Sequence, residues 1–430
     1  MKFDYGKQGI EIDLNSSWNV DIFKPIEQPT IKNPVEELRD SINHPISSEP
    51  LKKLIEKKKS IDQICIVVSD ATRPVPTNLI LKALVDELNS YGYEDDKIII
   101  LIATGLHRQS CEEDLIRILG DELKGRLKVI DHVSTDRNSQ EYLGETSDKV
   151  PIYIDKNYYN SDLKILTGYV EPHFFFGFSG GRKSIVPGIS GKETIQANHS
   201  AEYIASPYAR FGIYRENPMH KNALEAAKIV GVDFIVNVCI DQKHRVTKIA
   251  AGDLVKAHES LVDYQLRYAF KNIDNLYDIV ICGNGGYPLD LNLYQAVKSM
   301  AIGELAVKKG GTIISVNECI EGIGIAQNEF KELLFSGMTP HKIYKKILNK
   351  KIIVPDQWEI QILARILSQS EIFIVSELKE NEIGNIGLKY AATVEEAIES
   401  SLKKLKNNPK MLILPNGPQI LPIFNNEIKK

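Results

Sequence analysis

The sequence of 430 residues lacks the features that mark several specialised classes of protein. No apolar run approaches the roughly 20 residues of a membrane span, and the opening MKFDYGKQGIEIDL lacks the apolar core of a secretory signal. Cysteine is scarce, with five scattered residues that are never spaced as a metal-binding pair. The formal net charge is -4, so no overall basic field favours nucleic acid. We therefore expect a cytoplasmic protein with neither a membrane nor a nucleic-acid partner.

The composition that is present is that of a folded enzyme. Hydrophobic residues make up 43% and charged residues 26% of the chain, which is ordinary for a globular protein. The length exceeds what one core usually supports, so we expect more than one domain. No internal repeat or low-complexity tract is visible.

Short β-branched runs alternate with amphipathic helical stretches, which is typical of parallel sheets with crossover helices. The opening fourteen or so residues and the pair 233–241 and 245–252 are interpreted as antiparallel hairpins added to the first domain. A helix is expected over 77–88. The strands expected in the first half are residues 63–69, 97–103, 127–133 and 163–169.

A second α/β series begins near YDIVICGNGGYP and continues through GTIISVNE and EIFIVSEL. The predicted fold class is therefore α/β, with two domains, each a mainly parallel sheet flanked by helices, and added antiparallel strands in the first. We expect a first domain over 1–272, a second over 273–400, and a C-terminal segment, 401–430, that could return to the first.

The most distinctive stretch is YVEPHFFFGFSGGRKSIVPGISGKETIQANHS, residues 169–200. Its GFSGGRKS resembles the phosphate-binding loop G-x-x-x-x-G-K-[ST], but Arg182 stands where the second glycine is required. Pro187 and Gly188 follow Lys183 closely, so a helix cannot begin where that loop needs one. A nucleotide-triphosphatase loop is therefore not favoured.

A second glycine cluster, CGNGGYP, also fails a known fingerprint. It follows a strand, but Pro288 occupies the last glycine position of G-x-G-x-x-G. We interpret it as a turn from strand to helix, with Asp290 as the N-cap of a helix beginning near Leu291.

The chemistry available to the 169–200 stretch remains informative. Small residues let backbone amides approach a ligand, and Ser179, Arg182 and Ser184 could satisfy an anionic group. Lys183 could act as a nucleophile or a covalent tether. His199 follows a short helix and could return to the same cavity.

Other stretches carry polar residues directly after predicted strands or on one helical face. SDATRPVPT places Asp70, Thr72 and Arg73 after a strand, where Arg73 could hold a carboxylate or merely pair with Asp70. IATGLHR places His107 after the next strand. LNLYQAVKSM places Tyr294, Gln295 and Lys298 on one helical face, which could also be an exposed surface. VPDQWEIQ supplies Trp358, which could also be a core aromatic.

In their order along the chain, these motifs resemble the nickel-dependent lactate racemase family. The resemblance runs from DATRP through G-x-H, PHFFFGFSGGRKSI, PGI and NHS to DQW, so it covers most of the chain. Each motif alone is weak, but jointly they are specific, and none departs from the family pattern.

The resemblance implies a cofactor, pyridinium-3-thioamide-5-thiocarboxylic acid mononucleotide carrying nickel, attached covalently to Lys183. It implies His199 as the protein's nickel ligand, which suits imidazole, and His107 and His173 as the catalytic acid/bases. It also implies a substrate pocket of Arg73, Tyr294, Gln295, Lys298 and Trp358. The residues that we assign to cofactor binding beside Lys183 are Asp70, Thr72, Ser179, Gly180, Gly181 and Arg182.

The implied reaction interconverts the enantiomers of a small 2-hydroxy acid, D- and L-lactate first and another 2-hydroxy acid as the alternative. Oxidation and re-reduction by hydride transfer avoid removing a weakly acidic Cα proton, and two histidines serve the two enantiomers. Cofactor-assembly enzymes are the implied partners. Two other classes stay open: a nucleotide-binding regulatory protein that uses the Lys183 loop, and a zinc hydrolase built on His107, His173 and His199.

Overall fold

The computed structural model describes residues 1–325, 327–405 and 408–424. The chain forms two compact units. One, here called the Lys183 unit, comprises residues 28–203 and 207–267; the other, the Trp358 unit, comprises residues 1–27, 204–206 and 268–430.

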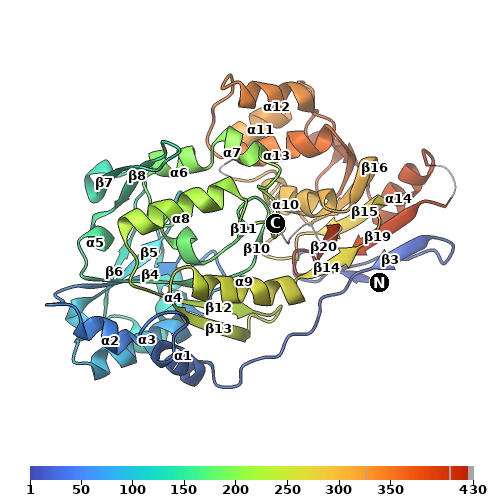
Figure 1. Ribbon diagram of the computed structural model, residues 1–430. Coiled ribbons are helices and arrows are strands. Elements are labelled where there is room, and N and C mark those ends of the chain that lie inside the picture. Colours follow the sequence, from blue (N-terminus) through green and yellow to red (C-terminus); the bar gives the residue numbers. More distant parts are fainter. Residues whose placement is uncertain (326, 406–407, 425–430) are drawn as a thin grey trace. The chain divides into compact units, whose positions relative to one another are not determined.

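A six-stranded sheet forms the centre of the Lys183 unit (Figure 1). Its strands are parallel except for β12 and β13 at one edge of the sheet, which form an antiparallel hairpin. The predicted strands and this predicted hairpin are confirmed. In sheet order the strands are β13 (Val246–Gly252), β12 (Phe234–Ile240), β9 (Leu163–Tyr169), β4 (Ile64–Ser69), β5 (Ile98–Ala103) and β6 (Lys128–Asp131).

Alternation along these strands divides the side chains between two apolar faces. On β4, Ile64, Ile66 and Val68 join a core cluster with residues of α1 (Pro34–Asn43), α3 (Thr77–Ser90) and α4 (Glu112–Leu123). The helix predicted over 77–88 is α3. The remaining elements of this unit are α2 (Leu51–Glu56), β7 (Gln140–Glu145), β8 (Pro151–Asp155), α5 (Lys156–Tyr159), β10 (Pro172–His173), β11 (Gly177–Phe178), α6 (Lys192–Asn198), α8 (Pro218–Val230) and α9 (Lys256–Tyr268).

The Trp358 unit is built on a second six-stranded sheet, in which every pair is parallel. In sheet order its strands are β18 (Lys389–Tyr390), β17 (Glu371–Val375), β16 (Val307–Val316), β15 (Tyr277–Gly283), β19 (Lys410–Leu414) and β3 (Asn19–Ile22). The other elements are β1 (Lys2–Phe3), β2 (Ile10–Glu11), β14 (Phe270–Ile273), β20 (Leu421–Phe424), α10 (Leu293–Glu304), α11 (Asn328–Leu334), α12 (Pro340–Leu348), α13 (Gln357–Leu367) and α14 (Val394–Leu402), and α7 (Ala201–Ala205) spans residues of both units.

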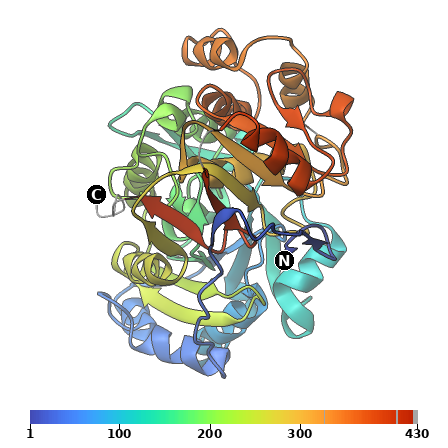
Figure 2. The same ribbon diagram turned by 90° about the vertical axis from the view of Figure 1, so that its right-hand side faces the viewer.

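Both ends of the chain belong to the Trp358 unit, which corrects two expectations. The predicted hairpin β1–β2 exists, but residues 1–27 do not belong to the first domain, because β3 pairs with β19. The C-terminal segment does not return to the first domain either, since β19 lies inside the second sheet and β20 pairs with β14. The dark-blue and red strands lie together in both views (Figures 1 and 2). Residues 406–407 and 425–430 of that segment lie outside the described residues.

The helix after CGNGGYP begins later than predicted. Asn292 is its N-cap, and the Asn292 side chain accepts a hydrogen bond from the Gln295 backbone N–H. Asp290, the residue predicted for this role, is fully buried and instead accepts hydrogen bonds from the backbone N–H groups of Gly6 and Glu318. The cluster itself is a turn from strand to helix, as expected.

The α/β class with two mainly parallel sheets is confirmed. Among the described residues, no helix combines the length and the apolar character that a membrane crossing requires.

One buried histidine–carboxylate pair ties three segments of the Lys183 unit together. His132 follows β6, and its Nδ1 lies 2.9 Å from Asp155 Oδ2 at the end of β8. Its Nε2 lies 2.8 Å from the Ser190 carbonyl oxygen. Both ring nitrogens therefore face acceptors, and His132 and Asp155 are 1% and 2% exposed. Removing one partner would leave an uncompensated polar group in the core.

We expect Asp155→Asn to lower the free energy of unfolding by about 3 kcal/mol or more, because the amide cannot compensate the buried imidazole. Urea denaturation measures this. Asp62→Asn is the control, since Asp62 pairs with Lys97 at the surface and such pairs contribute about 1 kcal/mol or less. Equal stabilities of the Asp155 and Asp62 variants would contradict the role of the buried pair.

Candidate active site

Three neighbouring parallel strands end at the same edge of the Lys183 unit's sheet. The order β9–β4–β5 brings together the loop after β4 with Asp70, the loop after β5 with His107, and the long segment after β9 that contains Lys183. The Gly105 N–H donates to the Gly188 carbonyl at 3.0 Å, which links the second loop to the third. Carboxyl ends of parallel strands are where open α/β sheets bind ligands.

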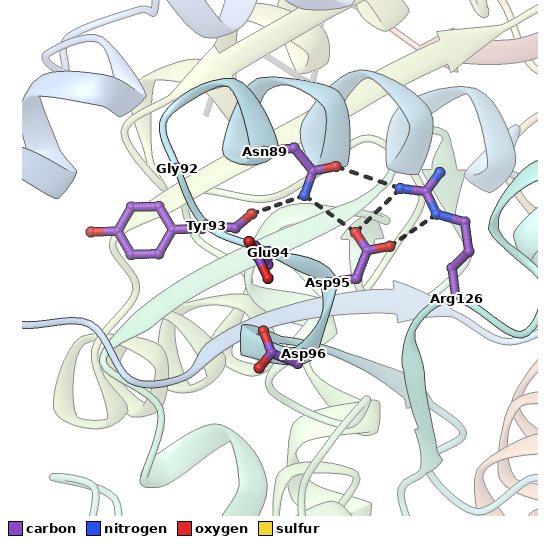
Figure 3. A pocket seen from close by; sticks show the side chains of 7 residues that line it. All are labelled: Asn89, Gly92, Tyr93, Glu94, Asp95, Asp96 and Arg126. Carbon is purple, nitrogen blue, oxygen red and sulfur yellow. Dashed lines mark hydrogen bonds and ion pairs between the residues drawn. The ribbon is translucent and has the colours of Figure 1, made fainter.

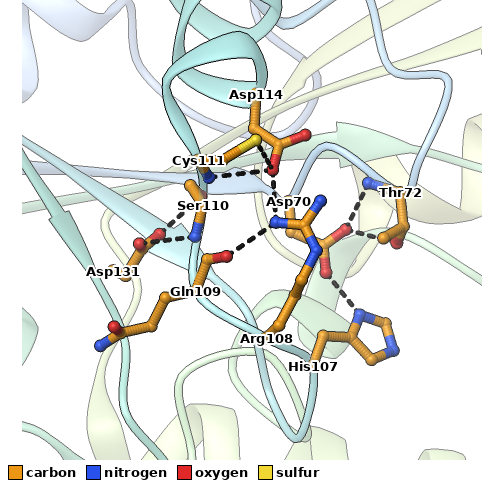
Figure 4. A network of polar contacts seen from close by, with 9 residues as sticks. All are labelled: Asp70, Thr72, His107, Arg108, Gln109, Ser110, Cys111, Asp114 and Asp131. Atoms are coloured by element: carbon orange, nitrogen blue, oxygen red, sulfur yellow. Dashed lines mark hydrogen bonds and ion pairs between the residues drawn. The ribbon is translucent and has the colours of Figure 1, made fainter. Parts of the chain in front are cut away.

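Asp70 and His107 form a tight pair at this edge (Figure 4). Asp70 Oδ2 lies 2.5 Å from His107 Nδ1, and Asp70 Oδ1 accepts from the Thr72 N–H at 2.8 Å and from its hydroxyl at 2.5 Å. Burial alone would raise the pKa of Asp70, but the hydrogen bond and charge of His107, with Arg73 and Thr72, lower it to about 2. Asp70 is therefore an ionised acceptor.

This pairing fixes the tautomer of His107. A carboxylate can only accept, so Nδ1 carries the proton and Nε2 of the neutral ring carries the lone pair. The His107 side chain is 44% exposed, and the loop after it is anchored by Ser110, whose N–H and hydroxyl both donate to Asp131. Arg73 is exposed in the turn beside Asp70 and contributes its charge there.

Protein side chains pack tightly against the glycines of the Lys183 loop. Gly180 and Gly181 have φ angles of 75° and 54°. A Cβ on Gly180 would lie 2.9 Å from Asn237 Oδ1, and one on Gly181 would lie 2.8 Å from the His258 ring. Glycine is required here because neighbouring side chains occupy the space.

Ser179 and Arg182 are engaged inside the protein. The Ser179 hydroxyl donates to the Tyr169 carbonyl and accepts from the Glu171 N–H, each at 2.9 Å. Arg182 is 2% exposed and its guanidinium contacts His220 Nε2 and the Leu254 carbonyl. Burial lowers the pKa of Arg182 to about 10, and the group remains a cation at neutral pH.

Lys183 lies beside His173 and an aromatic face. It belongs to a short 3-10 helix, Gly181–Ser184, so no α-helix begins here. Its Nζ is 4.0 Å from the centre of the Phe176 ring and 3.5 Å from His173 Nε2. His173 Nδ1 accepts from the Phe176 N–H at 3.3 Å, so Phe176 and Lys183 contact opposite nitrogens of the His173 ring.

His199 is buried at the end of α6, with its ring 5.4 Å from that of Phe175, which also contacts His173. His199 Nδ1 lies 3.0 Å from the Ile195 carbonyl oxygen, so Nδ1 donates and Nε2 carries the lone pair. Burial and the charge of Lys183 lower the pKa of His199 to about 3 despite the bond to Ile195. A neutral imidazole with one nitrogen fixed by a carbonyl is the form that metal-binding histidines take.

The other predicted residues form a second polar group in the Trp358 unit. Tyr294, Gln295 and Lys298 lie on α10, and Lys298 Nζ donates to Gln295 Oε1 at 2.7 Å. Tyr294 is 9% exposed and its ring meets Phe330 edge-on at 5.4 Å. Burial, Glu359 and Asp356 raise the pKa of Tyr294, while a hydrogen bond from Trp358 on α13 lowers it.

Glu359 is a polar residue of this group that the sequence reasoning missed. It follows Trp358 on α13 and is 2% exposed. Burial raises its pKa to about 8, with Lys298 acting in the lowering direction and Asp356 in the raising direction. No motif marks it, because a glutamate on a helix is usually a surface residue.

A surface hollow of about 470 Å³ lies elsewhere, at the amino ends of β5 and β6 (Figure 3). Arg126 Nε donates to Asp95 at 2.9 Å, and Asn89 donates to the Tyr93 carbonyl at 2.8 Å. Because it lies at the amino ends of strands that carry the candidate site at their carboxyl ends, we exclude it from that site. The residues lining it are Asn89, Gly92, Tyr93, Glu94, Asp95, Asp96 and Arg126.

Comparison with known proteins decides the family. The family model "Lactate racemase N-terminal domain" matches residues 5–212, and "Lactate racemase C-terminal domain" matches residues 273–421. A lactate racemase from Thermoanaerobacterium thermosaccharolyticum is 36% identical over 426 residues, 98% of each chain. The chain belongs to the lactate racemase family.

Further relatives and solved structures are similar to this chain. A lactate racemase from Lactiplantibacillus plantarum is 38% identical over 386 residues, 89% of each chain. The structure of the lactate racemase apoprotein from T. thermosaccharolyticum matches with a TM-score of 0.89 and 35% identity, over 98% of this chain and 99% of that one. A protein from Thermotoga maritima, at 18% identity and a TM-score of 0.66 over 91% of this chain and 99% of that one, shares the fold. The chain is accordingly an isomerase of the racemase type.

Within this racemase fold, the predicted residues form three local groups. Asp70 is hydrogen-bonded to both Thr72 and His107. Lys183 contacts His173, and its charge lowers the pKa of His199. The third group is Tyr294, Gln295, Lys298 and Trp358. Among the described residues, no three His, Cys, Asp or Glu side chains are grouped as a metal site. Asn237, His220 and His258 were not predicted, because no motif contains them.

We expect the stability of this racemase to fall as the pH decreases from about 6.5 towards 3, partly because of His258. Burial and Arg182 lower the pKa of His258 to about 3 despite its bond to Ser179. The unfolded chain therefore takes up a proton, worth about 1.4 kcal/mol per pH unit, that the folded chain does not. Denaturant titrations at several pH values should give a shallower loss for His258→Gln than for the unchanged protein; parallel losses would contradict the assignment.

Proposed function

We propose that this protein interconverts D- and L-lactate by hydride transfer, using a nickel pincer nucleotide attached to Lys183. The observation that supports it most strongly is the arrangement at the carboxyl ends of β9, β4 and β5. There His107 is paired with Asp70, and His173 lies next to Lys183, in a chain whose curated relatives are lactate racemases.

The residues present fit this cofactor. Lys183 supplies the amine for the covalent attachment, and His199 supplies a neutral imidazole whose Nε2 lone pair is set by the bond from Nδ1 to Ile195. A cofactor held by these residues would supply a reversible acceptor for the hydride from the substrate's Cα. The buried Phe175 and Phe176 rings beside Lys183 keep water from this part of the loop.

The two histidines take the base and acid roles. Asp70 holds the His107 proton on Nδ1, so His107 Nε2 can take the proton of a substrate hydroxyl. His173, in contact with Lys183, is the residue that returns a proton to the oxygen. For the opposite enantiomer the two residues exchange roles, because an imidazole can act both as a base and, once protonated, as an acid.

The family resemblance assigns substrate binding to charged and hydrogen-bonding side chains. Arg73 is exposed beside Asp70 and offers a bidentate partner for the carboxylate. Lys298 is held by Gln295, and Tyr294 by Trp358, so these groups are already oriented. The packing around Gly180, Gly181 and Arg182 gives them a supporting role, since Asn237, His258 and His220 occupy their surroundings.

Racemisation of lactate tests the proposal. Protein produced together with cofactor-assembly enzymes should convert either lactate enantiomer into a mixture, as chiral chromatography measures, and the Lys183 peptide should carry an added mass. Lys183→Arg retains the positive charge but cannot form the attachment, so it should lose both signals. Activity on another 2-hydroxy acid but not on lactate would replace the substrate; an active Lys183→Arg variant would remove the attachment.

We expect Asp70→Asn to reduce kcat roughly a hundredfold or more with little change in KM, because the amide no longer holds the His107 proton on Nδ1. The comparison variant is Thr72→Val, which removes the other side-chain bond to Asp70 and leaves His107 in place. Its loss of kcat should be much smaller. Equal losses in the two variants would argue against tautomer control by Asp70.

A further inference from the structure

The four residues that precede Lys183 are held by side chains from three different elements. Asn237 on β12 accepts from the Gly181 N–H at 2.7 Å. His258 on α9 lies 2.8 Å from the Ser179 carbonyl oxygen through Nε2. His220 on α8 contacts the Arg182 guanidinium through Nε2. The two histidines therefore bind opposite ends of one short loop.

The protonation of His258 follows from its partner. A carbonyl oxygen only accepts, so His258 Nε2 carries the proton and donates to Ser179. Nδ1 then carries the lone pair, and it has no partner among the described residues. His258 is fully buried, and burial with the charge of Arg182 keeps its pKa far below the ordinary value, so the ring is neutral.

His220 has the opposite tautomer. A guanidinium only donates, so His220 Nε2 carries the lone pair that receives Arg182 Nη1, and Nδ1 carries the proton. Burial and the charges of Arg182, His258 and Lys183 keep the pKa of His220 low. Its Nδ1 also lacks a partner within the described part of the chain, and the two rings lie 5.8 Å apart.

The buried Arg182 guanidinium requires hydrogen-bond acceptors. Its guanidinium is buried, and no carboxylate among the described residues forms an ion pair with it. Glu259 and Asp253 act on it only from a distance. A buried cation needs acceptors, and here they are a histidine lone pair and the Leu254 carbonyl. Arg182 therefore relies on His220 Nε2 for one of its two acceptors.

We propose that His220 and His258, in these two neutral tautomers, are positioning residues that hold residues 179–182 and thereby place Lys183 beside His173 and Phe176. The consequence for catalysis rests on the proposed function of Lys183. The positioning itself does not, because every contact involved belongs to the cofactor-free chain. Gly181 supports the same conclusion: its missing Cβ is what allows the His258 ring to lie against the loop.

Two pairs of variants separate positioning from packing. His220→Leu removes the acceptor for Arg182, whereas His220→Gln offers Oε1 in its place; His258→Leu removes the donor to Ser179, whereas His258→Gln keeps an N–H. Leu84→Ala, in the core on α3 and away from the loop, is the control that lowers stability alone.

Hydrogen exchange of the backbone N–H groups of residues 179–184, in cofactor-free protein, is the measurement. We expect roughly tenfold or faster exchange in the leucine variants, near-unchanged exchange in the glutamine variants, and unchanged exchange of this segment in Leu84→Ala. The mass added to Lys183 after maturation should fall in the same order. Leucine variants that exchange like the unchanged protein, or glutamine variants as fast as leucine, would overturn the proposal. Because exchange is read without cofactor, this comparison is decided even where lactate racemisation fails.

Discussion

The candidate active site depends on the adjacency of three parallel strands. Because β9, β4 and β5 are neighbours in register, their carboxyl ends deliver Asp70, His107 and the Lys183 segment to one edge. The strands Ile64–Ser69 and Ile98–Ala103 are buried along their length up to the last residue, so the loops that follow them start from well-packed positions. Loops that are far apart in the sequence can then place polar groups within hydrogen-bonding distance of one another.

The histidines of the Lys183 unit differ in their burial and in their hydrogen-bond partners. The Asp70 carboxylate fixes the proton of the half-exposed His107, which suits proton transfer. Burial keeps His199, His220 and His258 neutral, so each offers a lone pair or a directed N–H. His132 instead faces two acceptors inside the fold. Under the proposed function, the same side chain thus serves proton transfer, metal binding and the support of the fold according to its surroundings.

Much of the fold could be predicted from the sequence, because strand and helix periodicities are local properties. The β-branched runs at 63–69 and 97–103 correspond to β4 and β5, and DATRP and GLH indicated where polar groups follow strands. The strand β3, NVDI, could not be predicted, because a short half-exposed strand is defined by its partner β19, far along the chain. The same holds for Asp290, whose partners Gly6 and Glu318 are distant in sequence.

The surroundings of the Lys183 loop could not be predicted from the sequence for the same reason, since distant elements determine them. An arginine in a glycine-rich loop suggests an anion ligand, yet Arg182 is directed into the core by His220, which lies on α8. The paired glycines suggest room for a ligand, yet Asn237 and His258 occupy that room. Whether a polar group is buried depends on which elements pack against it, so the pattern of one segment does not predict its burial.

The central claim is that the substrate's Cα hydrogen moves as a hydride that is held within the site. Racemisation of lactate carrying deuterium at Cα, run in ordinary water, tests this most directly. The account predicts that the product enantiomer retains the deuterium at Cα, as mass spectrometry of the separated enantiomers would show. Loss of the deuterium to solvent at the rate of racemisation would mean that a histidine removes Cα–H as a proton, and would contradict the account.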